Sequence, residues 1–119
     1  MVRQKLLEET QNLSISQQKK IINYAIDIAV KMYQESNSQE DFDLILELYQ
    51  PLKYLNYWRS KYGHLCDNNI DDFTSDYMLC FVKACNFYKK DKSYKKSYYF
   101  NKYFHISFAC FIYNIPFIF

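Results

Sequence analysis

The chain contains very few residues that form tight turns: one glycine, Gly63, and two prolines, Pro51 and Pro116, among 119 residues. Sandwiches and barrels built from short strands need a turn roughly every 8–12 residues, and glycine and proline supply many of the backbone conformations in those turns. A few long helices need far fewer. The scarcity therefore predicts an all-α fold, and the length suits a single domain, residues 1–119, with one hydrophobic core.

Apolar residues recur at spacings of three and four in the first half of the chain, as in amphipathic helices. One such segment spans residues 16–35, and a second begins near Ser38, whose side chain is a good N-cap. Pro51 predicts a kink or a helix restart, after which the pattern continues to residue 62. The positions expected on the buried faces are Ile21, Ile22, Ala25, Ile28, Ala29, Met32, Phe42, Ile45, Leu48, Tyr49, Leu52 and Leu55.

The second half predicts a loop over residues 63–69, a helix that opens at Asp71 and Asp72, and a last helix that Ser97 caps and Pro116 stops. We therefore expect a compact bundle of four to five helices. The apolar positions of these two helices are Phe73, Tyr77, Cys80, Phe81, Ala84 and Tyr88, followed by Phe100, Phe104, Phe108 and Phe111.

Cysteine usage favours a reducing, cytoplasmic compartment. The N-terminal stretch MVRQKLLEET is charged throughout and does not resemble a signal peptide. On a helix Cys80 and Cys85 lie about 140° apart, as do His105 and Cys110, so neither pair forms a metal-binding face. We expect no metal and no cofactor, and we interpret the thiols as small buried apolar groups.

No set of catalytic residues is recognisable in the sequence. A chain with one glycine has no glycine-rich loop to hold phosphates. Asp72 and Asp76 lie four apart on one helical face, but carboxylates in a first helical turn more often stabilise the helix dipole than perform catalysis. The sequence therefore predicts a protein that is not an enzyme.

Charge is unevenly distributed. Residues 1–82 carry 8 basic and 12 acidic groups, whereas residues 83–119 carry 7 basic groups and 1 acidic group. An acidic first part followed by a basic, aromatic second part suits a protein that binds a polyanion through its second part only.

Residues 72–88 read DFTSDYMLCFVKACNFY, and FNKY follows at residues 100–103 after a basic segment. This order resembles region 2 of bacterial and phage RNA polymerase sigma factors, especially short divergent ones such as the late sigma factors of T-even phages and clostridial sigma factors. That family carries an acidic helix start of the type D-L-x-Q-E-G, then L-x-L-x-K-A, F-D, a basic loop and F-x-T-Y-A. Its positions correspond here to Asp72, Asp76, Leu79, Phe81, Lys83, Ala84, Tyr88, Phe100 and Tyr103.

The resemblance covers about residues 42–113 and leaves residues 1–37 as an N-terminal helical extension. It departs from the family at Ser75, which replaces a glutamine, at Tyr77, which replaces a glycine, and at residues 106–107, where the family has two tryptophans. The fold it implies is the helical bundle of sigma factor domain 2.

The function that the resemblance implies is transcription initiation. The helix from residue 72 to 88 would dock on the clamp-helix coiled coil of the largest subunit of core RNA polymerase, with contacts from Asp72, Ser75 and Asp76. A second transcription factor would supply promoter selectivity, because the resemblance does not extend to the domain that reads the −35 element.

Promoter opening needs cations that hold phosphates and rings that stack on unpaired bases. The chain offers both in its second half, where we expect contacts with promoter −10 DNA, either double- or single-stranded. The candidate DNA-binding residues are Lys92, Lys95, Lys96, Lys102, Tyr103 and Phe104.

Two other functions fit the same sequence. After Lys102, residues 103–119 hold no Asp, Glu, Lys or Arg, which is typical of a C-terminal membrane anchor, although 17 residues of helix span only about 25 Å. Alternatively, the chain is a helical interaction module, or an inhibitor of polymerase or of a sigma factor, whose aromatic tail covers a partner.

Overall fold

The computed structural model describes residues 1–65, 70–89 and 99–116, and these residues form helices and no strand. In chain order the elements are α1 (Val2–Glu9), α2 (Ile15–Ser36), α3 (Gln39–Tyr49), the 3-10 helix η1 (Pro51–Tyr54), α4 (Leu55–Tyr62), the 3-10 helix η2 (Gly63–Leu65), α5 (Ile70–Phe87) and α6 (Phe100–Ile112). The all-α prediction is confirmed.

Short polar side chains fix the ends of the first long helices. Ser14 and Gln17 form a capping box at the start of α2, because each side chain accepts the backbone N–H of the other residue. The helix ends at Asn37, whose φ of 53° lies in the left-handed region that asparagine tolerates. The Ser38 hydroxyl accepts the N–H of Asp41 and starts α3, as predicted.

The predicted restart at Pro51 is present. Gln50 adopts a left-handed conformation with φ of 55°, η1 follows, and α4 then continues the chain. The buried Tyr77 hydroxyl donates a hydrogen bond of 2.7 Å to the Pro51 carbonyl oxygen, which fixes this corner against α5. Leu52 was expected to be buried but is 58% exposed, because the 3-10 turn breaks the 3.6-residue period of the helix before it.

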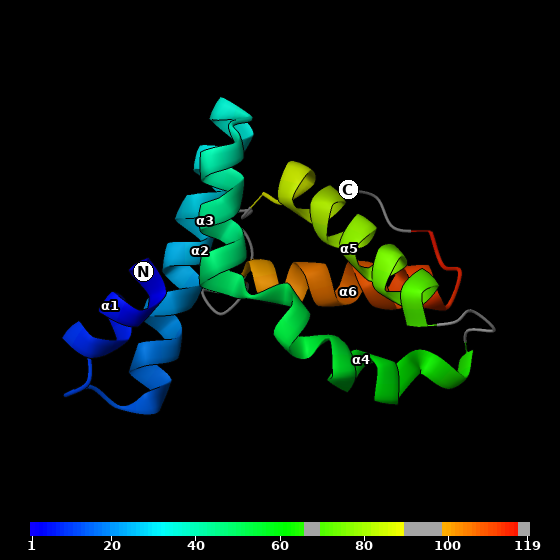
Figure 1. Cartoon of the computed structure of the whole chain (residues 1–119), viewed down its shortest axis with the longest axis horizontal. Coiled ribbons are helices and arrows are strands. Elements are labelled where there is room, and N and C mark those ends of the chain that lie inside the picture. The colour runs from blue at the N-terminus through cyan, green and yellow to red at the C-terminus, as the bar shows by residue number, and fades with distance from the viewer. Residues whose placement is uncertain (66–69, 90–98, 117–119) are drawn as a thin grey trace.

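Two helix pairs form the body of the molecule (Figure 1). α2 and α3 pack side by side as a hairpin, and α5 packs on α6. α2 also contacts both α5 and α6, so it joins the two pairs, while the short α1 packs on α2 and α3. α4 reaches α6 through Trp58, whose ring lies 5.8 Å from that of Phe108.

Aromatic rings make up the centre of the core. Phe81 stacks on Tyr49 with ring centroids 5.7 Å apart and meets Phe104 edge-on at 5.4 Å. Phe100 and Phe108 on α6 are fully buried, as predicted. Edge-to-face ring pairs add to the free energy gained by burying their area.

The predicted buried face of α5 is confirmed at Phe73, Tyr77, Cys80, Phe81, Ala84 and Tyr88. On α2 and α6 the apolar stripe in the sequence is wider than the face that is covered. Ile28 and Met32 are 45% and 42% exposed, and α2 instead buries Ile26 and Val30. Phe111 was also expected in the core, but it lies in the last turn of α6 and stays 45% exposed while it stacks on Phe108.

The predicted loop at 63–69 begins with η2, and its residues 66–69 lie outside the described ranges. Ser97, the expected cap of the last helix, also lies outside them, and α6 has Tyr99 at its N-cap position with no side-chain cap bond. The helix ends at Ile112, before Pro116. No helix within the described ranges combines the length and the apolar composition that a bilayer span needs.

Candidate functional site

The acidic start of α5 lies on the surface. Asp72 and Ser75 are exposed and Asp76 is half-buried. Their spacing of three and four residues puts the three side chains on one helical face, and Leu79, one turn further on, continues that face with 50% of its surface exposed. The structure therefore brings together the three residues predicted to contact polymerase, and it adds an apolar residue beside them.

The side of α5 opposite its exposed face is buried in the core. Phe73, Tyr77 and Phe81 are each at most 3% exposed and anchor the opposite side of the same helix in the core. Two carboxylates in the first turn, Asp71 and Asp72, also favour the positive end of the helix dipole. A partner would thus meet a preformed helical surface.

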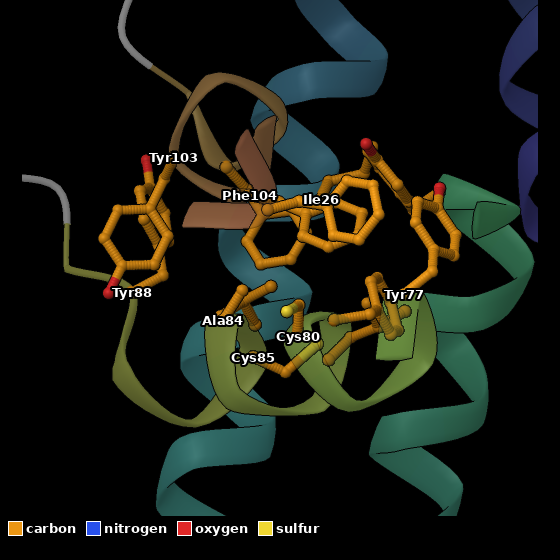
Figure 2. Packing of buried hydrophobic residues seen from close by; sticks show 14 of the residues in the cluster. Ile26, Tyr77, Cys80, Ala84, Cys85, Tyr88, Tyr103 and Phe104 are labelled. Atoms are coloured by element: carbon orange, nitrogen blue, oxygen red, sulfur yellow. The ribbon is translucent and has the colours of Figure 1, made fainter. Parts of the chain in front are cut away.

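The predicted DNA contacts on α6 divide into two kinds. Lys102 is exposed and lies in the first turn of the helix. Tyr103 and Phe104 are only 8% and 1% exposed, and Tyr103 lies beside Tyr88 with ring centroids 5.2 Å apart (Figure 2). These two rings belong to the hydrophobic core, so they present no face to an unpaired base in this conformation.

The other predicted phosphate contacts, Lys92, Lys95 and Lys96, lie outside the described residues. They remain predictions from the sequence.

Two polar side chains of α2 hold the facing ends of α5 and α6. The Gln34 amide donates hydrogen bonds to the carbonyl oxygens of Cys85, at 3.0 Å, and Tyr88, at 2.7 Å, at the end of α5. Asp27 accepts the backbone N–H of Phe100 at 3.1 Å, at the start of α6. These bonds satisfy helix-end groups that have no partner inside their own helix. Neither residue stands out in the sequence, because polar residues of an amphipathic helix are usually exposed to solvent.

The buried thiols and hydroxyls are poor nucleophiles. Burial raises the pKa of Cys80 to about 11 and also raises the pKa of Cys85, so both remain protonated. Burial likewise raises the pKa of Tyr49 and Tyr77. In the part of the chain that the structure describes, no group of three His, Cys, Asp or Glu side chains is arranged to hold a metal ion.

The fold lowers the pKa of His105. Its ring meets Trp58 edge-on with centroids 4.0 Å apart, and Lys61 lies over the same indole at 5.9 Å. Burial and the positive charge of Lys61 lower the pKa of His105, so the ring is neutral at pH 7. It therefore acts as an aromatic packing group on Trp58.

No protein-family model, no curated protein and no solved structure matches this chain.

Proposed function

We propose that this chain is a sigma-like transcription initiation factor that binds core RNA polymerase through the exposed face of α5. One observation carries the proposal: Asp72, Ser75, Asp76 and Leu79 occupy one surface of a helix that is anchored from behind. The first three are the residues to which the resemblance assigns polymerase contact. The exposed Leu79 beside the two carboxylates supports the proposal, because an apolar residue next to charged ones is a common feature of protein interfaces.

The chemistry of this face predicts a partner with basic residues. Carboxylates on the surface steer an oppositely charged partner and fix its register, while the burial of Leu79 supplies affinity. In the proposed complex α5 lies along a coiled coil, the clamp helices of the largest polymerase subunit. The complex should weaken as salt concentration rises, because exposed charge pairs are screened.

The proposed contact with promoter DNA rests on lysines alone. Lys102 is exposed on α6, and Lys92, Lys95 and Lys96 belong to the same basic stretch of sequence. We leave Tyr103 and Phe104 out of this contact, because both rings are buried. Without rings to stack on bases, the contact holds phosphates and carries little sequence preference.

A pull-down of bacterial core RNA polymerase tests the proposal. The variants are a double variant, Asp72→Lys with Asp76→Lys, and a single variant, Leu79→Glu. The matched control is Glu8→Lys with Glu9→Lys, which makes the same change in net charge at exposed positions of α1. We expect the wild-type chain and the control to bind polymerase and both α5 variants to lose binding.

Retained binding by both α5 variants, or no binding by the wild-type chain, would refute the proposal. Circular dichroism of each variant verifies that it is folded. Run-off transcription with the bound polymerase then distinguishes an initiation factor, which raises transcript yield, from an inhibitor, which lowers it.

A helical interaction module is the second candidate, and a feature of α2 favours it. Tyr24, Ile28 and Met32 follow one another at intervals of four residues and are each at least 42% exposed. Such a stripe suits a helical partner that packs along α2. Binding to polymerase that is lost in an Ile28→Glu variant and retained in the α5 variants would support this candidate.

A further inference from the structure

A groove of about 430 Å³ has no residue of the proposed polymerase face of α5 in its lining. One wall comes from α1 and α2 and carries Arg3 and Lys19. Another wall comes from η1 and α4 and carries Tyr54, Tyr57 and Trp58. The lining of the groove thus combines two cations with three aromatic rings, and its volume lies within the range of ligand pockets.

The charge of the groove is positive, although it lies in the acidic part of the chain. Its lining includes Arg3 and Lys19 and, among the described residues, no Asp or Glu. Arg3 uses its Nη1 to donate to the carbonyl oxygen of Leu48, and its other guanidinium N–H groups make no hydrogen bond within the described residues. Guanidinium has five N–H donors in total, so Arg3 can still bind an anion.

Polar groups in the groove also have unused hydrogen-bonding capacity. Asn23 lines the groove, and its side chain makes no hydrogen bond to any described residue. The Asn101 side-chain oxygen accepts the Tyr49 hydroxyl, which leaves the two amide N–H donors of Asn101 without a partner in the described part of the chain. Side-chain amides can match the donor and acceptor edges of a heterocyclic ring.

The aromatic wall has accessible rings. Tyr57 is 57% exposed and Tyr54 is 39% exposed, whereas the adjoining Trp58 is buried and meets the Tyr57 ring at 5.3 Å. A planar ring placed in the groove would cover the exposed tyrosines, and base-on-aromatic stacking is favourable for every base.

We infer that this groove binds a small planar aromatic anion of the mononucleotide class. The base stacks against Tyr54 and Tyr57, the amides of Asn23 and Asn101 meet its edge, and Lys19 with Arg3 binds the phosphate. This inference is independent of polymerase binding, because it uses no residue of the α5 face.

Trp58 makes the test direct, because it is the one tryptophan of the chain and lies in the wall of the groove. The full chain is titrated with AMP, GMP, CMP and UMP while Trp58 fluorescence is recorded, and calorimetry provides a second readout. Adenosine, which lacks the phosphate, and ribose 5-phosphate, which lacks the base, are the comparison ligands. We expect at least one mononucleotide to bind about tenfold more tightly than either of them.

Two variants and two matched controls locate the binding. Lys19→Glu and Tyr57→Ala change exposed residues of the groove, and each should weaken mononucleotide binding about tenfold. Lys20→Glu and Tyr24→Ala make the same changes at exposed positions of α2 outside this groove and should leave the affinity unchanged.

Three results would overturn the inference. The first is that no mononucleotide binds, and the second is that Lys19→Glu and Lys20→Glu bind equally well. The third is that the groove has another occupant: an acidic aromatic peptide or a second copy of the chain binds with Lys19 dependence while mononucleotides do not.

Discussion

The Gln34 amide bridges α2 to the end of α5, and its removal should destabilise the whole domain. Its two hydrogen bonds, to the Cys85 and Tyr88 carbonyl oxygens, are partly buried. Each such bond contributes about 0.5–1.5 kcal/mol net, and a carbonyl left without a donor loses more. A Gln34→Ala variant should therefore lower the free energy of unfolding by about 2 kcal/mol.

A Gln34→Glu variant sharpens this prediction. The substitution keeps the shape of the side chain, but an ionised carboxylate has no donor and faces two carbonyl oxygens. At pH 7 it should be less stable than Gln34→Ala. These oxygens favour the protonated acid and raise its pKa in the folded state above the ordinary value of about 4.3. The folded state then binds more protons, so the variant gains stability relative to Gln34→Ala as pH falls towards about 4.

Urea unfolding followed by far-UV circular dichroism measures these differences. The midpoint should move while the slope stays unchanged, because the surface exposed on unfolding is nearly the same. Lys31→Ala, at an exposed position one turn earlier on α2, is the control and should stay within about 0.5 kcal/mol of wild type. A Gln34→Ala variant as stable as this control would refute the role assigned to the amide.

Three further substitutions test the packing and the titration described above. Phe104→Ala should cost about 3–5 kcal/mol of unfolding free energy, and Phe111→Ala less than about 1 kcal/mol, because only the first ring is fully buried; equal losses in urea unfolding would contradict this. Tyr77→Phe removes the donor to the Pro51 carbonyl oxygen and should cost about 1–3 kcal/mol in the same assay; an unchanged midpoint would show that the bond contributes nothing. The lowered pKa of His105 means that the unfolded state binds the extra proton, so stability should fall as pH drops below the ordinary value of 6.5. A His105→Gln variant should lose this part of the pH dependence, and thermal melts from pH 7 to pH 5 that show the same slope for both proteins would contradict the assignment.

Much of the fold was predictable because local signals agreed. The residues that start α3 and restart the chain at Pro51 act within a few positions of themselves, so their effect is visible in the sequence. The buried face of α5 follows from an uninterrupted 3.6-residue period. These features depend on the neighbouring chain and hardly at all on distant contacts.

The wrong predictions of burial concern residues whose exposure is determined by contacts with segments far away in the sequence. Ile28 and Met32 belong to an apolar stripe on α2 that is wider than the face covered by α3, α5 and α6. The pattern of apolar residues in the sequence does not show which part of the stripe is covered. Leu52 and Phe111 fit a helical period that ends before them or at the edge of the core. Tertiary packing therefore determines which of these apolar residues are buried, whereas the helical period alone predicts burial for all of them.

The candidate site was predicted in part. Asp72, Ser75 and Asp76 share an exposed face, as their spacing predicts, whereas the exposure of Leu79 requires knowledge of how α5 is rotated. Tyr103 and Phe104 could equally stack on bases or fill the core when judged by sequence alone, and the structure places them in the core.

Site-specific photo-crosslinking tests the central proposal most directly. A photoreactive amino acid replaces Ser75, at the exposed centre of the α5 face, and in a control chain it replaces Gln39, an exposed residue of α3. The proposal predicts that the Ser75 probe crosslinks to the clamp-helix coiled coil of the largest subunit of core RNA polymerase and that the Gln39 probe does not. No crosslink from Ser75, or equal crosslinking from both positions, would contradict it.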